Sequence, residues 1–361
     1  MMSLYKTSLY LNHVALKAKI LPFAGYLMPI NYENGIQYEY KSVRDDVGLF
    51  DVSHMGQIVI SGINAPNLLK KVTVNNIDDL SSGKAQYSAL CNDTGGIIDD
   101  IIIYKLNELE YLLVVNGANR QKVYNWIKSN DKYKCDIKDK TFKSSLIAIQ
   151  GPNSRKYLEE FLNSIVDLKF YTHNYFIVNH QKILVSRTGY TGELGFELLG
   201  DSSVINTAWE YFINKNVNPC GLAVRDILRM EMKYCLYGND INESISPIEA
   251  GLGWIVNNKN DFIGKKIIID QKKVGVSKKL VCIRMTDRCI PRTGYKILSN
   301  NLEVGKVASG TFSSILNSGI ALAYLNTEFD KSKPLTVKIR NKLYNGKIVK
   351  PPFINNTSLH N

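Results

Sequence analysis

The chain has 361 residues, of which 45% are hydrophobic and 22% charged, an ordinary globular composition with room for two or three domains. No apolar run approaches eighteen residues, which excludes a membrane-spanning helix, and the six cysteines include no CxxC pair, which argues against a metal site or a disulfide framework. The net charge of +12 favours anionic partners, but without an arginine-rich tail or an RNA-binding signature we interpret the lysines of 259–279 as a solvated face.

The N-terminal segment has no acidic residue before Glu33, as in transit peptides, but it also has no arginine. It contains no signal-type apolar run followed by a small-residue cleavage site. We therefore expect a mature protein with a cytoplasmic location.

The first part of the chain has a compact α+β pattern. Asn64 with Pro66 marks a helix start, and the Asn-Asp-Thr-Gly-Gly sequence of 92–96 is a hairpin signal. In chain order, the pattern predicts a strand over 54–61, a helix over 64–72, a hairpin over 86–106, a strand over 110–117 and a helix over 119–130.

A second α+β region follows, and the chain ends in strands. The pattern predicts a strand over 145–152, a helix over 153–165, two strands within 182–200 joined by a glycine-rich turn, and a helix over 221–234. Short strands then alternate with turn sequences over 280–349, which predicts a separate all-β barrel.

Two adjacent aspartates, Asp99 and Asp100, interrupt the apolar run GGIIDDIIIYKL. A buried carboxylate is costly unless it is paired, hydrogen-bonded or protonated. Along a strand, Asp100 shares one face with Ile102 and Tyr104, whereas Asp99 shares the other face with isoleucines only. Both faces are otherwise apolar, so we expect the strand to be covered on both sides. Two structural aspartates at a strand end, or one aspartate lining a cleft, would each fit this pattern.

A glycine-rich turn in SRTGYTGELGFEL carries Tyr190 and Glu197. Glycines there permit a close approach of the backbone to a ligand, although an ornate hairpin turn is equally compatible.

The predicted helix 221–234 carries Arg225 and Arg229 one turn apart on one face. Asp226 can pair with Arg229 at i, i+3. Arg225 could bind a carboxylate or anchor Glu197, and ordinary pairing on the helix surface is the alternative.

Other chemistry finds little support in the sequence. No GxSxG, Walker or GxGxxG motif occurs. His54 follows a possible strand start and could act as a base, but a lone histidine is more often structural. We expect no metal.

Five segments together resemble the glycine cleavage system T protein, a tetrahydrofolate-dependent aminomethyltransferase. They occur in the family's order between Lys6 and Pro352, nearly the whole chain, which makes the resemblance specific. The segments are PFAGYLMPINY (22–32), DVSHMGQ (51–57), AQYSALCNDTGGIIDDIIIYKL (85–106), SRTGYTGELGFEL (186–198) and GLAVRDILRMEMKYCLYGND (221–240).

The resemblance implies an α+β, three-domain cloverleaf around a central folate site. Two of its domains are α+β with antiparallel sheets, and the third is a C-terminal β-barrel or jelly roll. We expect a folate-binding domain from 1–52 plus 137–245, a domain with the catalytic aspartate from 53–136 plus 246–275, and the barrel from 276–361.

The resemblance also implies a reaction. The aminomethyl group on the lipoyl arm of the H-protein gives its carbon to tetrahydrofolate, and the products are 5,10-methylenetetrahydrofolate, ammonia and the dihydrolipoyl carrier. We expect the lipoylated H-protein and tetrahydrofolate as partners, a monomer, and no nucleic-acid or membrane partner.

The family's essential aspartate matches Asp100, whose carboxylate can accept a proton and stabilise transient positive charge. Tyr104 matches a neighbouring pocket tyrosine, which agrees with the face that it shares with Asp100. Met55 and Tyr87 match residues that line the pterin pocket. Asp99 is left as a structural partner.

Glu197 and Arg225 match the pair that binds the pterin end of the folate, and Tyr190 matches a tyrosine of the same pocket. Tyr234 also matches a pocket residue, but it lies nine residues beyond Arg225, about half a turn out of phase. Both can face one pocket only if the helix ends or bends before Tyr234.

Several positions depart from the family pattern. Leu194 replaces the acidic residue that is usual in the family, Tyr26 replaces a common tryptophan, and Lys17 replaces a glycine. We expect these three differences to affect local packing more than activity. At the pocket edge, the resemblance leaves open whether Phe170 or Tyr171 contacts the folate.

Two other functions remain compatible with the scaffold. Folate-dependent demethylases share this fold, and fold does not fix function. A non-catalytic folate-binding protein would carry a KGCYxGQE-type motif, whereas this chain has KYCLYGND over 233–240. The intact GGIIDD, TGYTGE and GFE sequences favour aminomethyl transfer.

Overall fold

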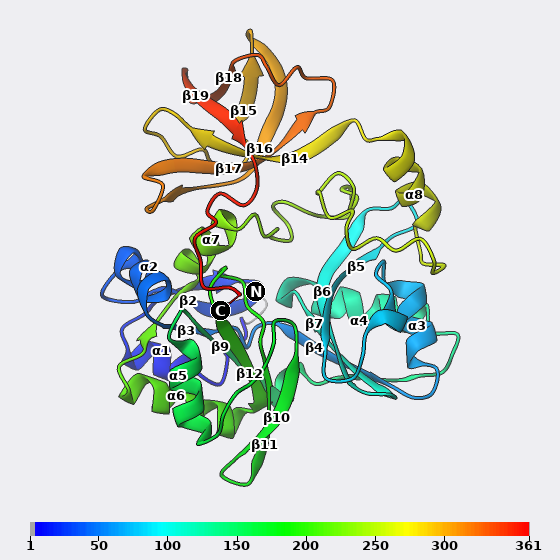
Figure 1. The fold of residues 1–361 in the computed structure, drawn as a ribbon, viewed down its shortest axis with the longest axis vertical. Coiled ribbons are helices and arrows are strands. Elements are labelled where there is room, and N and C mark those ends of the chain that lie inside the picture. The colour runs from blue at the N-terminus through cyan, green and yellow to red at the C-terminus, as the bar shows by residue number, and fades with distance from the viewer. Residues whose placement is uncertain (1–3, 361) are drawn as a thin grey trace.

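A computed structural model describes residues 4–360 and has three lobes that meet in the middle of the molecule (Figure 1). Residues 1–3 and 361, the outer ends of the first and third expected domains, lie outside the described residues. The expected α+β class, with two largely antiparallel sheets and a C-terminal barrel, is confirmed.

The first lobe is built on a six-stranded sheet. Its strands run in the order β10-β11-β12-β9-β3-β13, antiparallel except for the short parallel pair β3–β13. Helices α5 (Ser154–Leu162) and α6 (Ser202–Asn214) cover one face through a buried apolar cluster. The strands are β3 (Gly48–Asp51), β9 (Ser144–Gln150), β10 (His173–Val178), β11 (Gln181–Ser186), β12 (Gly195–Asp201) and β13 (Asn218–Pro219).

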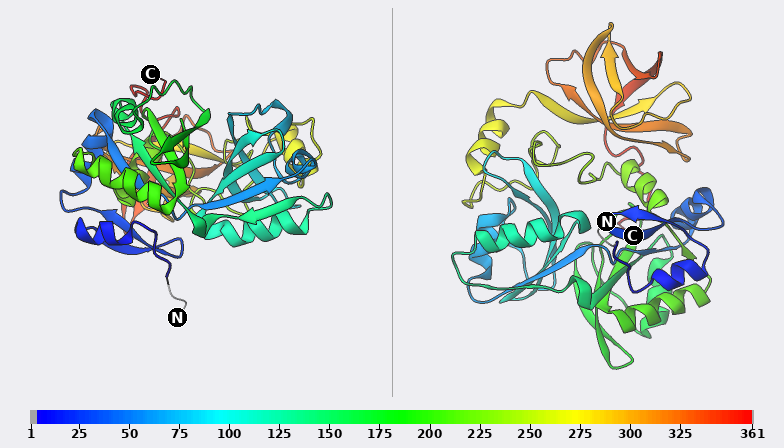
Figure 2. Two further views of the ribbon diagram at one scale, coloured as in Figure 1. Left: turned by 90° about the horizontal axis from the view of Figure 1, so that it is seen from below. Right: turned by 180° about the vertical axis from the view of Figure 1, so that it is seen from behind.

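The other face of this sheet packs on α2 (Ile36–Asp45) and α7 (Leu222–Glu231), because Phe50, Ala148 and Leu184 point away from α5 and α6. A small N-terminal unit flanks the lobe on the side opposite the end of the C-terminal tail (Figure 2). It comprises α1 (Tyr10–Ala15), β1 (Lys19–Phe23) and β2 (Tyr26–Asn31).

The second lobe is a five-stranded antiparallel sheet in the order β5-β6-β7-β4-β8. Ile101 and Ile103 of β6 pack with the helices on one face, whereas Ile102 and Tyr104 pack against the first lobe. The strand is thus covered on both sides, as expected. The elements are β4 (Gly56–Ser61), α3 (Ala65–Val72), β5 (Ala85–Cys91), β6 (Ile97–Asn107), β7 (Glu110–Val115), α4 (Arg120–Ser129) and β8 (Asp136–Asp139), with 3-10 turns at Ile77–Asp79, Gly117–Asn119 and Thr141–Lys143.

The third lobe is a closed barrel in the order β14-β17-β16-β15-β18-β19, which confirms the predicted all-β region. Helix α8 (Lys265–Val274) lies between the second lobe and the barrel, and a tail after the barrel returns to the first lobe (Figure 1). The strands are β14 (Lys278–Met285), β15 (Lys296–Ser299), β16 (Leu302–Ser313), β17 (Ser318–Asn326), β18 (Leu335–Ile339) and β19 (Lys342–Val349).

Helix α3 begins directly after Asn64, as predicted, whereas two other helices end early: α5 ends at Leu162, three residues before the predicted end, and α7 is also shorter than predicted. Asn64 occupies the N-cap position of α3, but its side chain makes no capping hydrogen bond, because its backbone (φ −97°, ψ 1°) is not in the extended conformation that capping requires. Helix α7 ends at Glu231, three residues earlier than predicted.

Candidate functional site

Asp100 lies on β6, half-buried, and is held by neutral donors. The Tyr87 hydroxyl donates to its Oδ2 at 2.9 Å, and the Asn116 amide donates to its Oδ1 at 2.9 Å. Burial raises the pKa of Asp100 to about 6, although these two hydrogen bonds act in the opposite direction. The carboxyl group can therefore exchange a proton near neutral pH.

Asp99 points to the opposite face and is fully buried. It accepts hydrogen bonds from the backbone N–H of Asn116 at 3.0 Å and from the Asn119 amide at 2.5 Å. Burial, followed by the charge of Asp100, raises its pKa. Strand alternation separates the two carboxylates as expected.

Asn116 joins the two faces, because it follows the end of β7 next to the aspartates. Its amide nitrogen donates to Asp99 Oδ1 at 2.9 Å as well as to Asp100 Oδ1. We missed this residue in the sequence, although an asparagine directly after the apolar strand EYLLVV is a usable signal. We call Asp99, Asp100, Asn116 and Tyr87 the aspartate wall.

Tyr87 extends this wall toward solvent. Its ring stacks on Trp254 with ring centroids 5.9 Å apart, and Trp254 is 71% exposed. The Lys272 ammonium group donates to Gly253 O at 3.2 Å and thus holds the loop that carries Trp254. A large exposed aromatic surface beside Asp100 suits a planar ligand. Trp254 was also missed, although a tryptophan in the glycine-rich AGLGW is conspicuous.

Tyr104 lies on the same face of β6 as Asp100 and is buried. Its hydroxyl contacts Thr188 Oγ1 at 3.2 Å and donates to Glu197 Oε2 at 3.4 Å. The Thr188 hydroxyl donates to the same carboxylate oxygen. Glu197 is half-buried. Strands β6 and β12 thus bring the two predicted residues, Tyr104 and Glu197, into direct contact.

Three predicted residues form a second surface, which we call the aromatic wall: Tyr190, Tyr234 and Arg225. The two tyrosine rings stack with centroids 5.6 Å apart, and the Arg225 guanidinium lies over the Tyr190 ring at 4.7 Å. The Tyr190 hydroxyl donates to the Cys235 carbonyl. Burial raises the pKa of Tyr190, and the charge of Asp100 adds to the increase. Tyr87 of the aspartate wall packs against the apolar cluster that contains Cys235, so the two walls lie close together.

The early end of α7 places Tyr234 in this wall. Lys233 adopts a left-handed conformation (φ 61°), and the N–H groups of Lys233 and Tyr234 return to Met230 O and Arg229 O, both at 2.9 Å. This is the Schellman arrangement that ends helices. The condition set by helix geometry, that the helix must end before Tyr234, is therefore met.

Arg225 and Glu197 make no ion pair within 4 Å in the described part of the chain, so the direct anchor considered for them does not form. Burial lowers the pKa of Arg225, whereas the more distant charge of Glu197 raises it. The Nη1 atom of Arg225 is buried without a hydrogen-bond partner among residues 4–360. A buried guanidinium N–H without a partner suits a bound ligand that offers a hydrogen-bond acceptor.

Met55 and Tyr171 lie beside the residues of the candidate site. Both pack, partly buried, against the apolar cluster that contains Tyr104. Burial raises the pKa of Tyr171, and Tyr234, Glu197 and Asp100 add to the effect. The Phe170 ring instead meets His360 edge-on at 5.5 Å. Tyr171 is thus the aromatic of the pair that lies among the site residues.

His54 is buried at the seam between the first two lobes, edge-on to the Phe23 ring at 5.5 Å. Its Nδ1 has no hydrogen-bond partner among the described residues. Burial lowers its pKa to about 4, so it is neutral at physiological pH. These features fit the structural interpretation of this residue.

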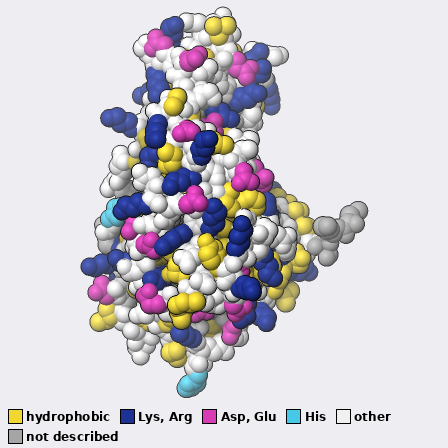
Figure 3. Space-filling model, turned by 90° about the vertical axis from the view of Figure 1, so that its right-hand side faces the viewer, with side chains coloured by type: hydrophobic (Ala, Val, Ile, Leu, Met, Phe, Trp, Pro, Cys, Tyr) yellow, Lys and Arg dark blue, Asp and Glu magenta, His cyan; other side chains and the backbone are white. Residues whose placement is uncertain are grey.

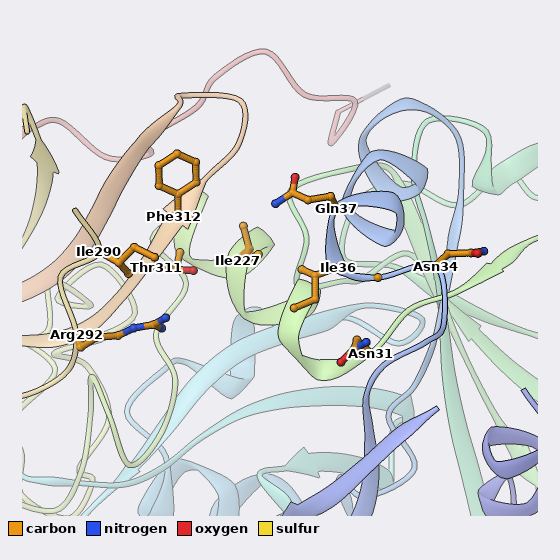
Figure 4. Close-up of a pocket in the computed structure, with 10 residues that line it drawn as sticks. Asn31, Asn34, Ile36, Gln37, Ile227, Ile290, Arg292, Thr311 and Phe312 are labelled. Carbon is orange, nitrogen blue, oxygen red and sulfur yellow. The ribbon is translucent and has the colours of Figure 1, made fainter. Parts of the chain in front are cut away.

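A pocket of about 630 Å³ lies away from both walls (Figure 4). It is bounded by the start of α2, by Ile227 on α7, and by Arg292 and Phe312 of the third lobe. None of its lining residues belongs to either wall.

Residues 4–360 contain neither a cluster of metal-ligating side chains nor a helix suited to crossing a membrane. No group of three or more His, Cys, Asp or Glu side chains is placed to hold a metal ion. No helix in this range is long and apolar enough to cross a membrane.

Comparison with known proteins covers nearly the whole chain. The GCVT N-terminal domain matches residues 9–260, and the glycine cleavage T-protein C-terminal barrel domain matches residues 278–355. An aminomethyltransferase of Halothermothrix orenii is 42% identical over 97% of this chain and 99% of its own length. Another, of Flavobacterium psychrophilum, is 42% identical over 96% of this chain and 98% of its own length.

A solved structure agrees in fold. The glycine cleavage system aminomethyltransferase T from Bartonella henselae aligns with a TM-score of 0.92 at 30% identity, covering 98% of this chain and 99% of that chain. Matching domains, relatives similar over their full length and a matching structure confirm the resemblance. The chain therefore belongs to the glycine cleavage T-protein family of aminomethyltransferases.

Proposed function

We propose that the protein transfers the methylene carbon of an aminomethyl group, carried on the lipoyl arm of the H-protein, to tetrahydrofolate. The observation that carries this proposal is the pairing of a half-buried carboxyl group, Asp100, with an adjacent wall of stacked tyrosines and an unpaired guanidinium. The first suits proton transfer, and the second suits a flat polar heterocycle.

The proposed step balances without an oxidant or a metal. The C–N and C–S bonds of the aminomethyl group break, and two C–N bonds form to the pterin-side nitrogens. Those nitrogens lose two protons in total, which leave with ammonia and the carrier thiol. Asp100 accepts a proton and stabilises transient positive charge nearby, more effectively in a dry site than in water.

In this proposal the other residues bind and orient. Tyr190 and Tyr234 contact the pterin rings, while Arg225 and Glu197 hydrogen-bond its polar edge. Met55, Tyr87 and Tyr104 line the same pocket, and Tyr171 contacts the more distal part of the folate. Holding two large substrates in register supplies much of the rate enhancement of such transfers.

A substrate assay separates this function from the alternative on the same scaffold. The purified protein, tetrahydrofolate and aminomethylated lipoyl carrier should release ammonia and form methylenetetrahydrofolate. Methyl transfer from a sulfonium compound with no ammonia release would favour a demethylase. Folate binding with neither activity would favour a non-catalytic protein.

We further propose that the basic surface speeds encounter with an acidic carrier in the cytoplasm, with the enzyme acting as a monomer. Figure 3 shows Lys and Arg side chains spread over one whole face among acidic ones. Charge of this kind acts mainly on association rate and is screened by salt. The Michaelis constant for the carrier should therefore rise with ionic strength, and a constant value would exclude steering.

A further inference from the structure

The side chain of Arg44, on α2 and outside both walls, is buried and binds two buried carboxylates at once. Its Nη1 donates to Glu193 Oε1 at 2.6 Å and to the Thr191 carbonyl at 2.9 Å. Its Nη2 donates to Glu231 Oε2 at 2.5 Å. The side chains of Arg44, Glu193 and Glu231 are 5%, 3% and 0% exposed.

The two carboxylates belong to the two elements that carry the aromatic wall. Glu193 follows Tyr190 by three residues in the same turn, and Glu231 precedes Tyr234 by three residues at the end of α7. One rigid guanidinium fork therefore fixes the separation of the turn from the helix end. The stacking of Tyr190 on Tyr234 depends on that separation.

Further hydrogen bonds hold the carboxylates of Glu231 and Glu193 in place. The hydroxyls of Tyr40 and of Ser313, in the barrel, donate to Glu231 Oε1 at 2.8 and 2.5 Å. Ser358, in the C-terminal tail, donates its N–H to Glu193 Oε2 at 2.8 Å. Burial works to lower the pKa of Arg44, but Glu231 and Glu193 more than offset it, so the guanidinium stays charged. The network thus joins α2, the glycine-rich turn, the end of α7, the barrel and the C-terminal tail.

We propose that Arg44 is a positioning residue for tetrahydrofolate binding, acting through the spacing of Tyr190 and Tyr234. This inference rests on the proposed function. A lysine would keep the positive charge but lose the planar fork, so it cannot hold both carboxylates in the same geometry.

A double-mutant cycle tests the inference by calorimetric titration with tetrahydrofolate. Arg44→Lys and Tyr234→Leu should each weaken tetrahydrofolate binding, Arg44→Lys by about tenfold. The double variant should bind only slightly more weakly than whichever single variant has the higher dissociation constant, because both changes remove the same stacked arrangement. Arg284→Lys, at a partly buried arginine of the barrel that donates to Leu316 O at 2.9 Å, is the matched control and should bind like wild type.

The outcomes distinguish the two proposals. Multiplicative losses in the double variant, or unchanged binding by a folded Arg44→Lys protein, would overturn the positioning role and leave the proposed function standing. Absence of tetrahydrofolate binding by the wild type would overturn the proposed function and this inference with it. If Arg44→Lys does not fold, the same cycle run with Glu193→Gln, which keeps the shape but loses one charge, should show the same non-additivity, and multiplicative losses there would equally overturn the role.

Discussion

The two walls of the site are held by different kinds of contact. Asp100 receives its hydrogen bonds from a tyrosine hydroxyl and an asparagine amide, and no cation pairs with it among residues 4–360. The aromatic wall is instead fastened from behind by buried ion pairs, those of Arg44 and of Arg229, whose guanidinium binds Asp240 at 2.5 Å.

Under the proposed function, this difference separates the group that takes part in the chemistry from the groups that bind tetrahydrofolate. Neutral donors leave the pKa of Asp100 raised by burial, to about 6, so that its carboxylate can accept a proton under cellular conditions. A cation at the same place would hold the pKa low and weaken the base. Buried ion pairs suit the other wall, because it must keep its geometry without titrating.

Loss of the carboxylate should have the largest effect. Asp100→Asn keeps the size of the side chain but cannot accept the proton, so we expect turnover to fall roughly 10³-fold while tetrahydrofolate binds within a few-fold of wild type. Ammonia release and calorimetric binding, measured on the same preparation, check this. Turnover near the wild-type rate would remove Asp100 from the chemistry.

Loss of the Arg225 guanidinium group from the aromatic wall should weaken tetrahydrofolate binding rather than turnover. Arg225→Lys removes the orphan N–H donor, so we expect the dissociation constant of tetrahydrofolate to rise roughly 10- to 100-fold, the range for a hydrogen bond to a charged group. Turnover at saturating folate should change much less. A fall in turnover with unchanged binding would reverse the roles assigned to the two walls.

Asn116→Leu should shift a pH profile. The amide lowers the pKa of Asp100, so its removal should raise that pKa by about one unit and move the acid limb of turnover to higher pH. We expect about a fivefold loss of turnover near pH 6, and recovery toward pH 8. If the acid limb of the pH profile stayed at the same pH, the Asn116 amide would not affect the pKa of Asp100.

Asp99→Asn should be milder in turnover than Asp100→Asn, with less than a tenfold loss. Both oxygens of Asp99 accept hydrogen bonds, so an asparagine there would place its NH₂ group against an N–H donor of Asn116 or Asn119. We therefore expect the free energy of unfolding to fall by about 1–3 kcal/mol. Urea unfolding and the coupled assay measure the two effects. Equal loss of turnover in both variants would defeat the division between the aspartates.

His54 should affect stability alone. Because its pKa is about 4 when folded and near 6.5 when unfolded, the unfolded state binds more protons, and stability declines as pH falls from about 6.5 toward 4. The total effect is about 3 kcal/mol. His54→Phe should flatten this part of the stability profile in urea unfolding at pH 7 and 4.5, with turnover retained. An unchanged profile would assign the acid sensitivity to other groups.

Local periodicity predicted part of the site. The alternation of β6 placed Asp100 and Tyr104 on one face, and the i, i+3 pair of Asp226 and Arg229 forms at 2.8 Å. These features depend on a single element, so the sequence pattern is sufficient to predict them.

Features that depend on contacts between elements were not predictable in this way. Asn116 reaches both aspartates only because β7 pairs with β6 and ends beside them. Tyr234 reaches its place only through the left-handed Lys233, a conformation that lysine rarely adopts and that local propensity does not favour. Arg44 lies far along the chain from both carboxylates that it joins.

The pH dependence of wild-type turnover, measured beside that of tetrahydrofolate binding, tests the separation of the two walls most directly. Turnover should fall below about pH 6 with a single ionisation, as Asp100 becomes protonated, while the dissociation constant stays flat over the same range. Turnover that is flat from pH 5 to 8, or a dissociation constant that follows the same ionisation, would contradict the account.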